Sequence, residues 1–178
     1  MIYFITGNPN KLAELQAILP DRIAVRHKAL HLVEIQSMDP HEIVRHKLRE
    51  AYAAVESPVM VEDVSAELDS LKGLPGPFIK FFEEQLGSDA LYQLAPDDRV
   101  TIRCTMGYYD GDTEIIVDGI VHGRTVEPRG TNGFGFDNCI LLDGQTTTSA
   151  ELAPEYKNTI SHRHAAVILM AEALDKKR

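Results

Sequence analysis

The first third of the chain alternates short apolar segments with amphipathic ones. Strand-like runs occupy residues 2–6, 23–30 and 58–63, and helix-like patterns begin between them at Pro9 and Pro40. Strands that alternate with helices are typical of parallel strands joined by helical crossovers. The order therefore predicts a mixed α/β fold that is organised by a long twisted sheet.

Both predicted helices have the same kind of start. Asn8 and Asp39 are residue types that cap helices, and each is followed by a proline, which suits the first helical position. Apolar residues then recur at helical spacing. The predicted buried positions are Leu12, Leu15, Ile18 and Leu19 in the first helix and Ile43, Val44, Leu48, Ala51, Ala54 and Val55 in the second.

The rest of the chain changes from this alternation to hairpins. Residues 73–86 read as a Gly/Pro loop that enters an aromatic-rich helix, and residues 100–126 read as two strands with a turn at Asp110-Gly111. A glycine-rich loop and a strand follow over residues 132–144. The last helix is expected to begin near Ser161 and to bury Ala165, Ile168, Leu169 and Ala173. We expect these parts to form a single domain over residues 1–178.

Length and composition narrow the class of protein. The chain has 178 residues, of which 44% are hydrophobic, and this is the size of one globular domain. A formal net charge of −9 argues against binding nucleic acid through a broad basic face. No apolar run approaches the ~20 residues of a membrane span, and the N-terminus lacks signal-peptide features, so we expect a cytoplasmic protein with no membrane partner. Cys104 and Cys139 are expected to be buried thiols rather than a disulfide.

Several cations occupy positions that are unfavourable without an anion. Lys11 lies in a first helical turn, where the helix dipole opposes it by about 0.3–1 kcal/mol. Lys47 falls inside the apolar face of the helix that begins at Pro40, and its head either reaches water or binds the same anion as Lys11. Three basic residues crowd the first turn of the last helix, either as an exposed basic turn or beside an anion: His162, Arg163 and His164. We expect the anion at the lysines to be a substrate rather than the protein's own carboxylates.

Carboxylates follow the third predicted strand. Residues 58–63 end in Glu62 and Asp63, and paired carboxylates at the carboxyl end of a strand suit Mg²⁺. Alternatively, the two acids begin a solvated loop. Glu34 could converge on the same site or be an exposed strand residue.

Two phenylalanines flank a glycine in the segment GFGFD. Phe134 and Phe136 would share one side of an extended segment and could enclose a flat ring; alternatively, both belong to the core. The sequence contains no P-loop, no dinucleotide-binding fingerprint and no nucleophile elbow. These absences exclude the common nucleotide-binding and esterase motifs, but not a different phosphate site.

Four motifs together resemble the inosine triphosphate pyrophosphatase family. They occur in order over nearly the whole chain and read TGNPNK, VEDVSAELDSLKGLPGPFIKFF, GFGFD and EYKNTISHR. The resemblance implies an elongated mixed sheet whose helices form two lobes around a central nucleotide cleft, in a homodimer. It also implies Mg²⁺-dependent hydrolysis of inosine triphosphate (ITP), dITP and xanthosine triphosphate (XTP) to nucleoside monophosphate and pyrophosphate. The partners would be small-molecule nucleoside triphosphates, not nucleic acid.

The resemblance further implies roles for individual residues. Asp63 would bind Mg²⁺ together with Glu34 and would activate the attacking water. Val64 departs from the family pattern, because a hydroxyl residue is usual there and Ser65 could supply it, and Phe136 replaces a common Tyr or Trp. The substrate-binding residues would be Thr6, Gly7, Asn8, Pro9, Asn10, Lys11 and Lys47 around the phosphates, and Lys80, Phe134, Gly135, Phe136, Asp137, Lys157, His162 and Arg163 on the rest of the nucleotide.

Two other functions fit parts of the pattern. A nucleotide sensor would keep the phosphate-binding residues without turnover, and a Maf-type pyrophosphatase would act on modified pyrimidines or methylated bases. Asp63 and Glu34 beside both lysines favour catalysis, because a sensor needs no acid that activates water. The helix start SHR favours a 6-oxopurine base. We therefore expect a pyrophosphatase for deaminated purine nucleotides.

Overall fold

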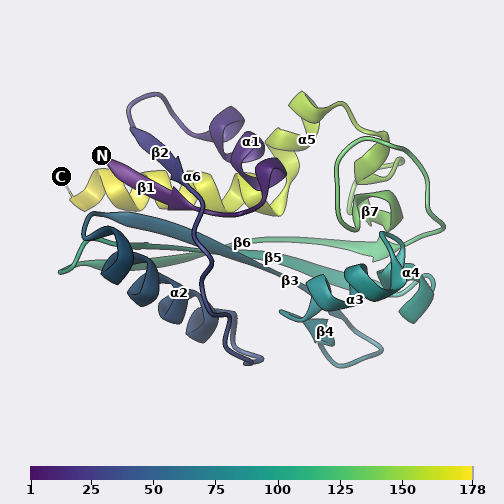
Figure 1. Cartoon of the computed structure of the whole chain (residues 1–178). Helices are drawn as coiled ribbons and strands as arrows, with labels where there is room; N and C mark the ends of the chain where they lie inside the picture. The colour runs from purple at the N-terminus through teal and green to yellow at the C-terminus, as the bar shows by residue number, and fades with distance from the viewer. Residues whose placement is uncertain (178) are drawn as a thin grey trace. The chain divides into compact units, whose positions relative to one another are not determined.

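The computed structural model describes residues 1–177 and has the predicted mixed α/β fold (Figure 1). A 7-stranded sheet has the order β2-β1-β3-β5-β6-β7, and β4 pairs with β3. The strands are β1 (Ile2–Ile5), β2 (Val25–Lys28), β3 (Val59–Leu68), β4 (Pro75–Gly76), β5 (Arg99–Tyr109), β6 (Glu114–Thr125) and β7 (Ile140–Leu142). The helices are α1 (Pro9–Ile18), α2 (Pro40–Val55), α3 (Ile79–Leu86), α4 (Ala90–Leu94), α5 (Pro154–Ile160) and α6 (His162–Lys177).

The chain packs into two compact units, which we call unit 1 and unit 2. Unit 1 comprises Met1–Asp63, Cys104–Gly119 and the chain from Arg163 onward. Unit 2 comprises Val64–Arg103 and Ile120–His162. Each unit has a hydrophobic core of its own. The single domain predicted for residues 1–178 stays a prediction.

Unit 1 begins with the alternation that the sequence predicts. β1 pairs in parallel with β2, in the register Ile2↔Val25, and with β3, in the register Tyr3↔Val59. α1 connects β1 to β2, and α2 connects β2 to β3. Parallel neighbours require such crossovers, because the chain must return to the same end of the sheet before the next strand begins.

The predicted starts of both helices are confirmed. The Asn8 side chain caps α1 by accepting from the backbone N–H groups of Asn10 and Lys11, and the Asp39 side chain caps α2. Each helix begins at its proline, Pro9 or Pro40. Lys11 therefore occupies the third position of α1, as its spacing from the cap predicts.

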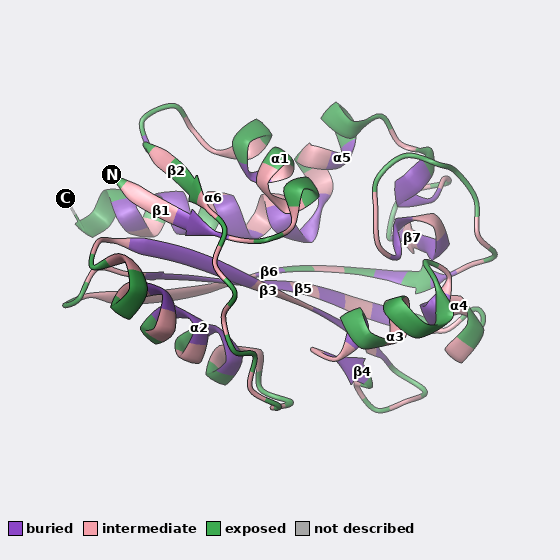
Figure 2. Cartoon of the chain, viewed as in Figure 1, coloured by how far each residue is buried: buried purple, intermediate pink, exposed green. Residues whose placement is uncertain are grey.

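The inner face of α2 packs closely on the sheet of unit 1. A Cβ at Gly107 of β5 would lie 2.5 Å from Val44 and 2.8 Å from Leu48, so glycine allows this close approach. Figure 2 shows the buried residues of α2 on the side of the helix that meets the strands. Ala54 is exposed, contrary to the prediction, because it lies near the end of the helix. The buried residues of α2 are Ile43, Val44, Lys47, Leu48 and Ala51.

The buried face of α6 differs from the predicted one. Leu169, expected in the core, is 43% exposed. Apolar residues surround most of this helix, so their spacing alone does not select a face. The buried positions follow Arg163 at intervals of three and four residues, and the ion pairs of Arg163 fix that face. They are Ala166, Val167, Met170, Ala171 and Leu174.

The sequence predicts that the third strand ends at Glu62 and Asp63, but β3 does not end there. It continues to Leu68 and pairs antiparallel with β4, where Ala66 lies opposite Gly76. Ala66 and Leu68 are fully buried in the core of unit 2, and this burial stabilises the extension of the strand. The two acids therefore lie within a strand, and the alternative of a solvated loop is wrong as well.

Unit 2 combines β4, α3, α4 and β7 with parts of the long strands. β6 and β7 are antiparallel, with Gly123 opposite Leu142, and the predicted strand in residues 132–144 is confirmed as β7. The aromatic-rich helix is confirmed as α3. The core of unit 2 includes Ile79, Leu91, Ile102 and Ile140.

Both cysteines are buried free thiols, as predicted. Burial raises the pKa of Cys139 to about 11, and burial together with the neighbouring Glu62 raises the pKa of Cys104. Thiols with raised pKa values are poor nucleophiles at neutral pH. Among residues 1–177, no helix is long and apolar enough to cross a membrane.

Candidate active site

The neighbouring acids Glu62 and Asp63 project to opposite faces of β3. Side chains alternate along a strand, and the partners of these two acids follow that rule. Glu62 contacts Arg163 of α6, whereas Asp63 contacts Lys47 of α2. Within unit 1, α6 and α2 lie on opposite sides of β3 (Figure 1). The hypothesis that Glu62 and Asp63 hold one metal ion together is therefore wrong.

Glu62 is the centre of a buried ion cluster. Arg163 donates from Nε to Oε2 at 2.9 Å and from Nη2 to Oε1 at 2.8 Å, and Lys11 Nζ lies 3.2 Å from Oε1. Arg163 also pairs through Nη1 with Glu14 of α1. The side chains of Glu62 and Arg163 are only 1% and 2% exposed. Burial alone would raise the pKa of Glu62, but Arg163 and Lys11 more than offset it and hold that pKa well below its usual range.

This cluster answers the electrostatic problem of Lys11 in the first turn of α1. The anion beside Lys11 is the protein's own Glu62, so the expectation that the lysines avoid the chain's carboxylates is wrong. The Lys11 side chain is 22% exposed, and its contact with Glu62 uses one of three ammonium donors. Binding of substrate phosphate by Lys11 stays a prediction.

Lys47 joins two acids on the other face of β3. Its Nζ lies 2.8 Å from Oδ1 of Asp63 and 2.7 Å from Oε1 of Glu34. The lysine is buried, as predicted from its place on the apolar face of α2. Burial alone would lower the pKa of Lys47, but Asp63 and Glu34 outweigh that effect and raise it above its ordinary value. Lys47 is therefore a cation at neutral pH.

The second oxygen of Asp63 has an unusual environment. Asp63 Oδ2 is buried and has no hydrogen-bond partner among residues 1–177. A buried carboxylate oxygen without a partner is costly, and such atoms call for an explanation. The adjacent Glu34 lies in a segment without helix or strand, and its side chain is 41% exposed. Oxygen ligands from Asp63 and Glu34 would suit Mg²⁺, although residues 1–177 contain no group of three or more potential metal ligands.

The loop after β1 is held by local hydrogen bonds. Thr6 Oγ1 accepts from the Asn8 N–H at 3.1 Å, and Asn8 Oδ1 accepts from the Asn10 N–H at 2.9 Å. Gly7, Pro9 and Asn10 are exposed. The predicted phosphate-binding residues of this loop therefore lie at the surface of unit 1, next to the start of α1.

In unit 2, Asp137 forms a buried polar centre. Its Oδ2 accepts from the ammonium of Lys157 and, at 2.9 Å, from the backbone N–H of Phe134. The Lys157 Nζ also lies 5.0 Å from the centre of the Phe134 ring. A Cβ at Gly133, where φ is +79°, would lie 2.2 Å from Asp137. The loop thus closes tightly around this carboxylate.

The two phenylalanines of this loop occupy different environments. Residues 131–136 form bends and a turn, so the extended segment that would put both rings on one side is not formed. Phe136 is buried in the core of unit 2, and its ring centre lies 6.4 Å from that of His162. Phe134 is only half-buried. Lys80 is exposed on α3.

The position after Asp63 is apolar in its contacts as well as in its side chain. Val64 packs against the core of unit 2. Ser65 is fully buried, and its hydroxyl donates to Glu67 at 3.1 Å. Ser65 is therefore already engaged within the protein.

Neither Glu14 nor the structural role of Glu62 was predicted from the sequence. One signal for Glu62 was available, because it follows three apolar residues in a strand, and a charged residue in such a run needs a buried partner. Glu14 lies one helical turn after Lys11, which places both on one face of α1. Neither pattern identifies Arg163 as the partner, because it lies 101 residues from Glu62 in the sequence.

Glu62→Ala should lower the free energy of unfolding by about 3–5 kcal/mol, because it leaves Arg163 buried without its main partner. Glu114→Ala is a matched control, since Glu114 also pairs with two arginines, Arg45 and Arg49. Those arginines are 51% and 55% exposed, so this change should cost at most about 1 kcal/mol. Urea unfolding at neutral pH measures both. Equal losses would contradict the dominant role of the Glu62 cluster.

Because of the same cluster, we expect the free energy of unfolding to decrease at acidic pH. Because the pKa of folded Glu62 lies below its ordinary value of 4.5, its stabilisation is complete above that pH and is lost as the pH falls toward the folded pKa.

Comparison with known proteins identifies relatives over nearly the whole chain. The model of the Ham1 family matches residues 2–173. An inosine triphosphate pyrophosphatase of Ajellomyces capsulatus is 42% identical over 178 residues, covering 97% of this chain and 96% of that protein. A protein of the same name from Schizosaccharomyces pombe is 36% identical and covers 99% and 96%. A HAM1 protein structure from Coxiella burnetii superposes with a TM-score of 0.85 at 26% identity, covering 98% of both chains.

Proposed function

Because this chain belongs to the Ham1 family, we propose that it hydrolyses ITP and other deaminated purine nucleoside triphosphates to nucleoside monophosphate and pyrophosphate. Relatives with 36–44% identity carry the name inosine triphosphate pyrophosphatase, and this supports the substrate class. The observation that carries the catalytic part is the buried Asp63 Oδ2, which has no hydrogen-bond partner in the described part of the chain and lies beside a cation and a second acid.

In this proposal Asp63 is the general base. Lys47 holds Oδ1, which leaves Oδ2 to accept a proton from water. The water oxygen bonds to phosphorus, the α–β phosphoanhydride bond breaks, and pyrophosphate leaves with the bonding electron pair. Lys47 is charged at neutral pH and cannot take this proton itself. Its role is to orient Asp63 and to offset charge on the triphosphate.

Asp63 and Glu34 would hold Mg²⁺ in the same proposal. Their oxygens both contact Lys47 Nζ, so they are close enough to share one small cation. Two protein carboxylates suit Mg²⁺, because this ion takes its remaining ligands from water and substrate phosphates. When bound, Mg²⁺ would polarise a phosphoryl oxygen and neutralise charge on the substrate.

The loop after β1 and Lys11 would bind the phosphates. Gly7 and Asn10 are exposed, and Lys11 keeps donors beyond its contact with Glu62. Exposed backbone N–H groups at the start of a helix favour anions, which supports this assignment. The substitution Lys11→Ala would remove both a proposed phosphate ligand and an ion-pair partner of Glu62.

Unit 2 would recognise the base. Lys157 is buried beside Asp137 and next to the Phe134 ring, and His162 lies near Phe136. Ammonium and imidazole N–H groups can donate to the 6-oxygen of hypoxanthine or xanthine. Contact of Arg163 or Lys80 with the nucleotide stays a prediction, since Arg163 is engaged by Glu62 and Lys80 lies on the exposed side of α3.

The resemblance also leads us to propose a homodimer that acts in the cytoplasm. The molar mass in solution, measured by light scattering, tests the first part, and fractionation of cells tests the second. Neither part is needed for the assignment of Asp63.

A pyrophosphate-release assay tests the function. ITP, dITP and XTP should release pyrophosphate in the presence of Mg²⁺, and chelation with EDTA should abolish release until Mg²⁺ is added back. Binding of ITP without release would support a sensor instead. Release from modified pyrimidine or methylated nucleotides, with none from ITP, would support a Maf-type enzyme.

A further inference from the structure

The edge strand β2 contributes a side chain to the loop that follows β1. The two strands are parallel, with His27 opposite Phe4, so both run toward the same end of the sheet. His27 Nε2 lies 2.8 Å from the carbonyl oxygen of Thr6. A carbonyl oxygen can only accept, so Nε2 carries a proton and donates it.

This hydrogen bond acts on the peptide unit between Thr6 and Gly7. The unit is planar and trans, so the C=O of Thr6 and the N–H of Gly7 point in opposite directions. Holding the carbonyl therefore sets the direction of the Gly7 N–H. The restraint matters because glycine tolerates many backbone conformations, and among the described residues none other than its two chain neighbours comes within 4 Å of the position of a Cβ on Gly7.

The other hydrogen bonds of the loop act on later residues. Thr6 Oγ1 accepts from Asn8, and Asn8 Oδ1 accepts from Asn10 and Lys11. These bonds fix the start of α1, but none of them holds the Thr6 carbonyl. The contact from β2 thus adds a restraint that the loop sequence does not supply.

We propose that His27 is a positioning residue for nucleotide binding, which holds the Thr6–Gly7 peptide so that the Gly7 N–H donates to a phosphate oxygen. The inference rests on the proposed function, which assigns this loop to the triphosphate. Successive backbone N–H groups in a loop are effective anion donors when their directions are fixed. His27 itself touches the peptide and not the substrate.

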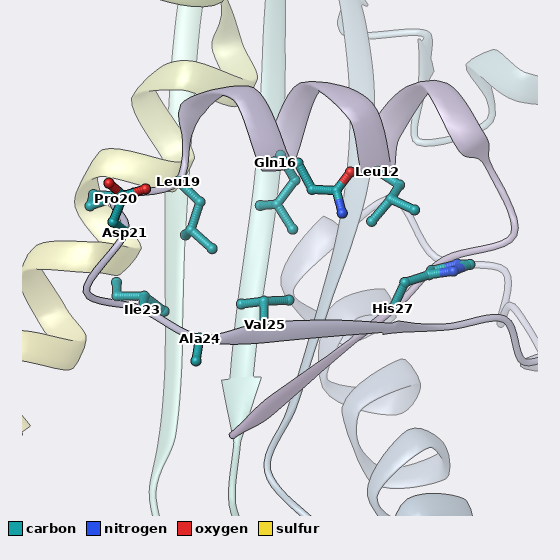
Figure 3. A pocket seen from close by; sticks show the side chains of 10 residues that line it. Leu12, Gln16, Leu19, Pro20, Asp21, Ile23, Ala24, Val25 and His27 are labelled. Carbon is teal, nitrogen blue, oxygen red and sulfur yellow. The ribbon is translucent and has the colours of Figure 1, made fainter.

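The surroundings of His27 permit substitution. With Leu12 and Gln16 it lines a cavity of about 280 Å³ in unit 1. Figure 3 shows the side chains of His27 and Val25 on the side of β2 that faces α1. His27 is exposed, so its replacement removes little buried contact. Changes at this position should therefore leave the fold intact.

The test compares His27→Ala with His27→Gln, whose side-chain amide carries an N–H donor at the same number of bonds from the backbone. His27→Ala should weaken the binding of inorganic pyrophosphate about fivefold, the typical worth of one net hydrogen bond, and should raise KM for ITP more than it lowers kcat. His27→Gln should restore both. In NMR spectra, added pyrophosphate should shift the Gly7 amide signal in the parent protein and in His27→Gln, and less in His27→Ala.

Arg26→Ala is the matched control, because Arg26 is exposed on the same strand and points to the other side. It should leave pyrophosphate affinity and the Gly7 signal unchanged. Hydrolysis of ITP with a pyrophosphate affinity that does not depend on His27, or a loss that glutamine fails to restore, would overturn the inference alone. Binding of pyrophosphate that depends on His27, without hydrolysis of any nucleotide, would overturn the proposed function and support the inference. No binding of pyrophosphate together with no hydrolysis of ITP would overturn both, whereas hydrolysis of ITP without any binding of pyrophosphate would overturn the inference alone.

Discussion

Asp63→Asn should lower kcat for ITP by about 10²–10⁴-fold, because the amide keeps the shape of the side chain but cannot accept a proton from water. Lys47 can still donate to the remaining carbonyl oxygen, so the fold of unit 1 should persist. Steady-state pyrophosphate release measures the loss, and calorimetric titration with ITP measures binding in the same variant. We expect binding to survive within an order of magnitude.

Asp143→Asn is the control for this change. Asp143 also pairs with a cation, Arg99, but both side chains are about half exposed. The same loss of a carboxylate charge there should leave kcat unaltered. If Asp63→Asn kept activity within a few-fold of the parent enzyme, Asp63 would have no role as a base.

The parent protein should prefer ITP to ATP in kcat/KM by as much as about 10⁴–10⁵-fold, since sites built to hydrogen-bond one group reject the analogue that lacks it. Hypoxanthine presents an acceptor oxygen at the 6-position, whereas adenine presents an amine. Lys157 can only donate, so it would leave the adenine amine facing another donor in a buried setting. Competing release assays with both nucleotides measure the ratio.

GTP is the informative control for this discrimination. Guanine carries the same 6-oxygen, so Lys157 cannot exclude it, and the Asp137 carboxylate could accept from its 2-amino group. We therefore expect GTP to be rejected less strongly than ATP, and Asp137→Asn to reduce the preference for ITP over ATP by releasing Lys157. Equal hydrolysis of ATP and ITP by the parent protein would remove the assignment of unit 2 to the base.

Local signals in the sequence predict the framework of unit 1 well. Asn8 and Asp39 cap their helices as expected, since a cap depends on residues that are adjacent in the chain. The inward position of Lys47 also follows from helical spacing alone. Such features need no knowledge of distant segments.

Features that depend on distant partners could not be predicted in this way. Arg163 lies 149 residues from Glu14 and 101 from Glu62, and no periodicity records these pairings. The choice of buried face on α6 follows from them, because its apolar residues cover more than one face. β3 extends past Asp63 for a similar reason, since its second half is stabilised by the core of unit 2.

The two phenylalanines of the segment GFGFD show the same limit within a single loop. The spacing of Phe134 and Phe136 places both rings on one side only if the backbone is extended. Gly135 instead adopts a φ of +62°, which turns the chain and places Phe136 in the core. Glycine permits this conformation but does not require it, so the sequence left both alternatives open.

Glu62 and Asp63 project to opposite faces of β3, and this also limits which insertions and deletions the strand can tolerate. Removing or adding one residue between Val59 and Asp63 would shift the register by one, and a shift of one turns every following side chain to the other face. Asp63 would then meet Arg163, and the acid before it would meet Lys47. Composition would hardly change, yet the buried ion cluster and the proposed base would exchange places. We infer that this stretch tolerates substitutions at its apolar positions far better than insertions or deletions.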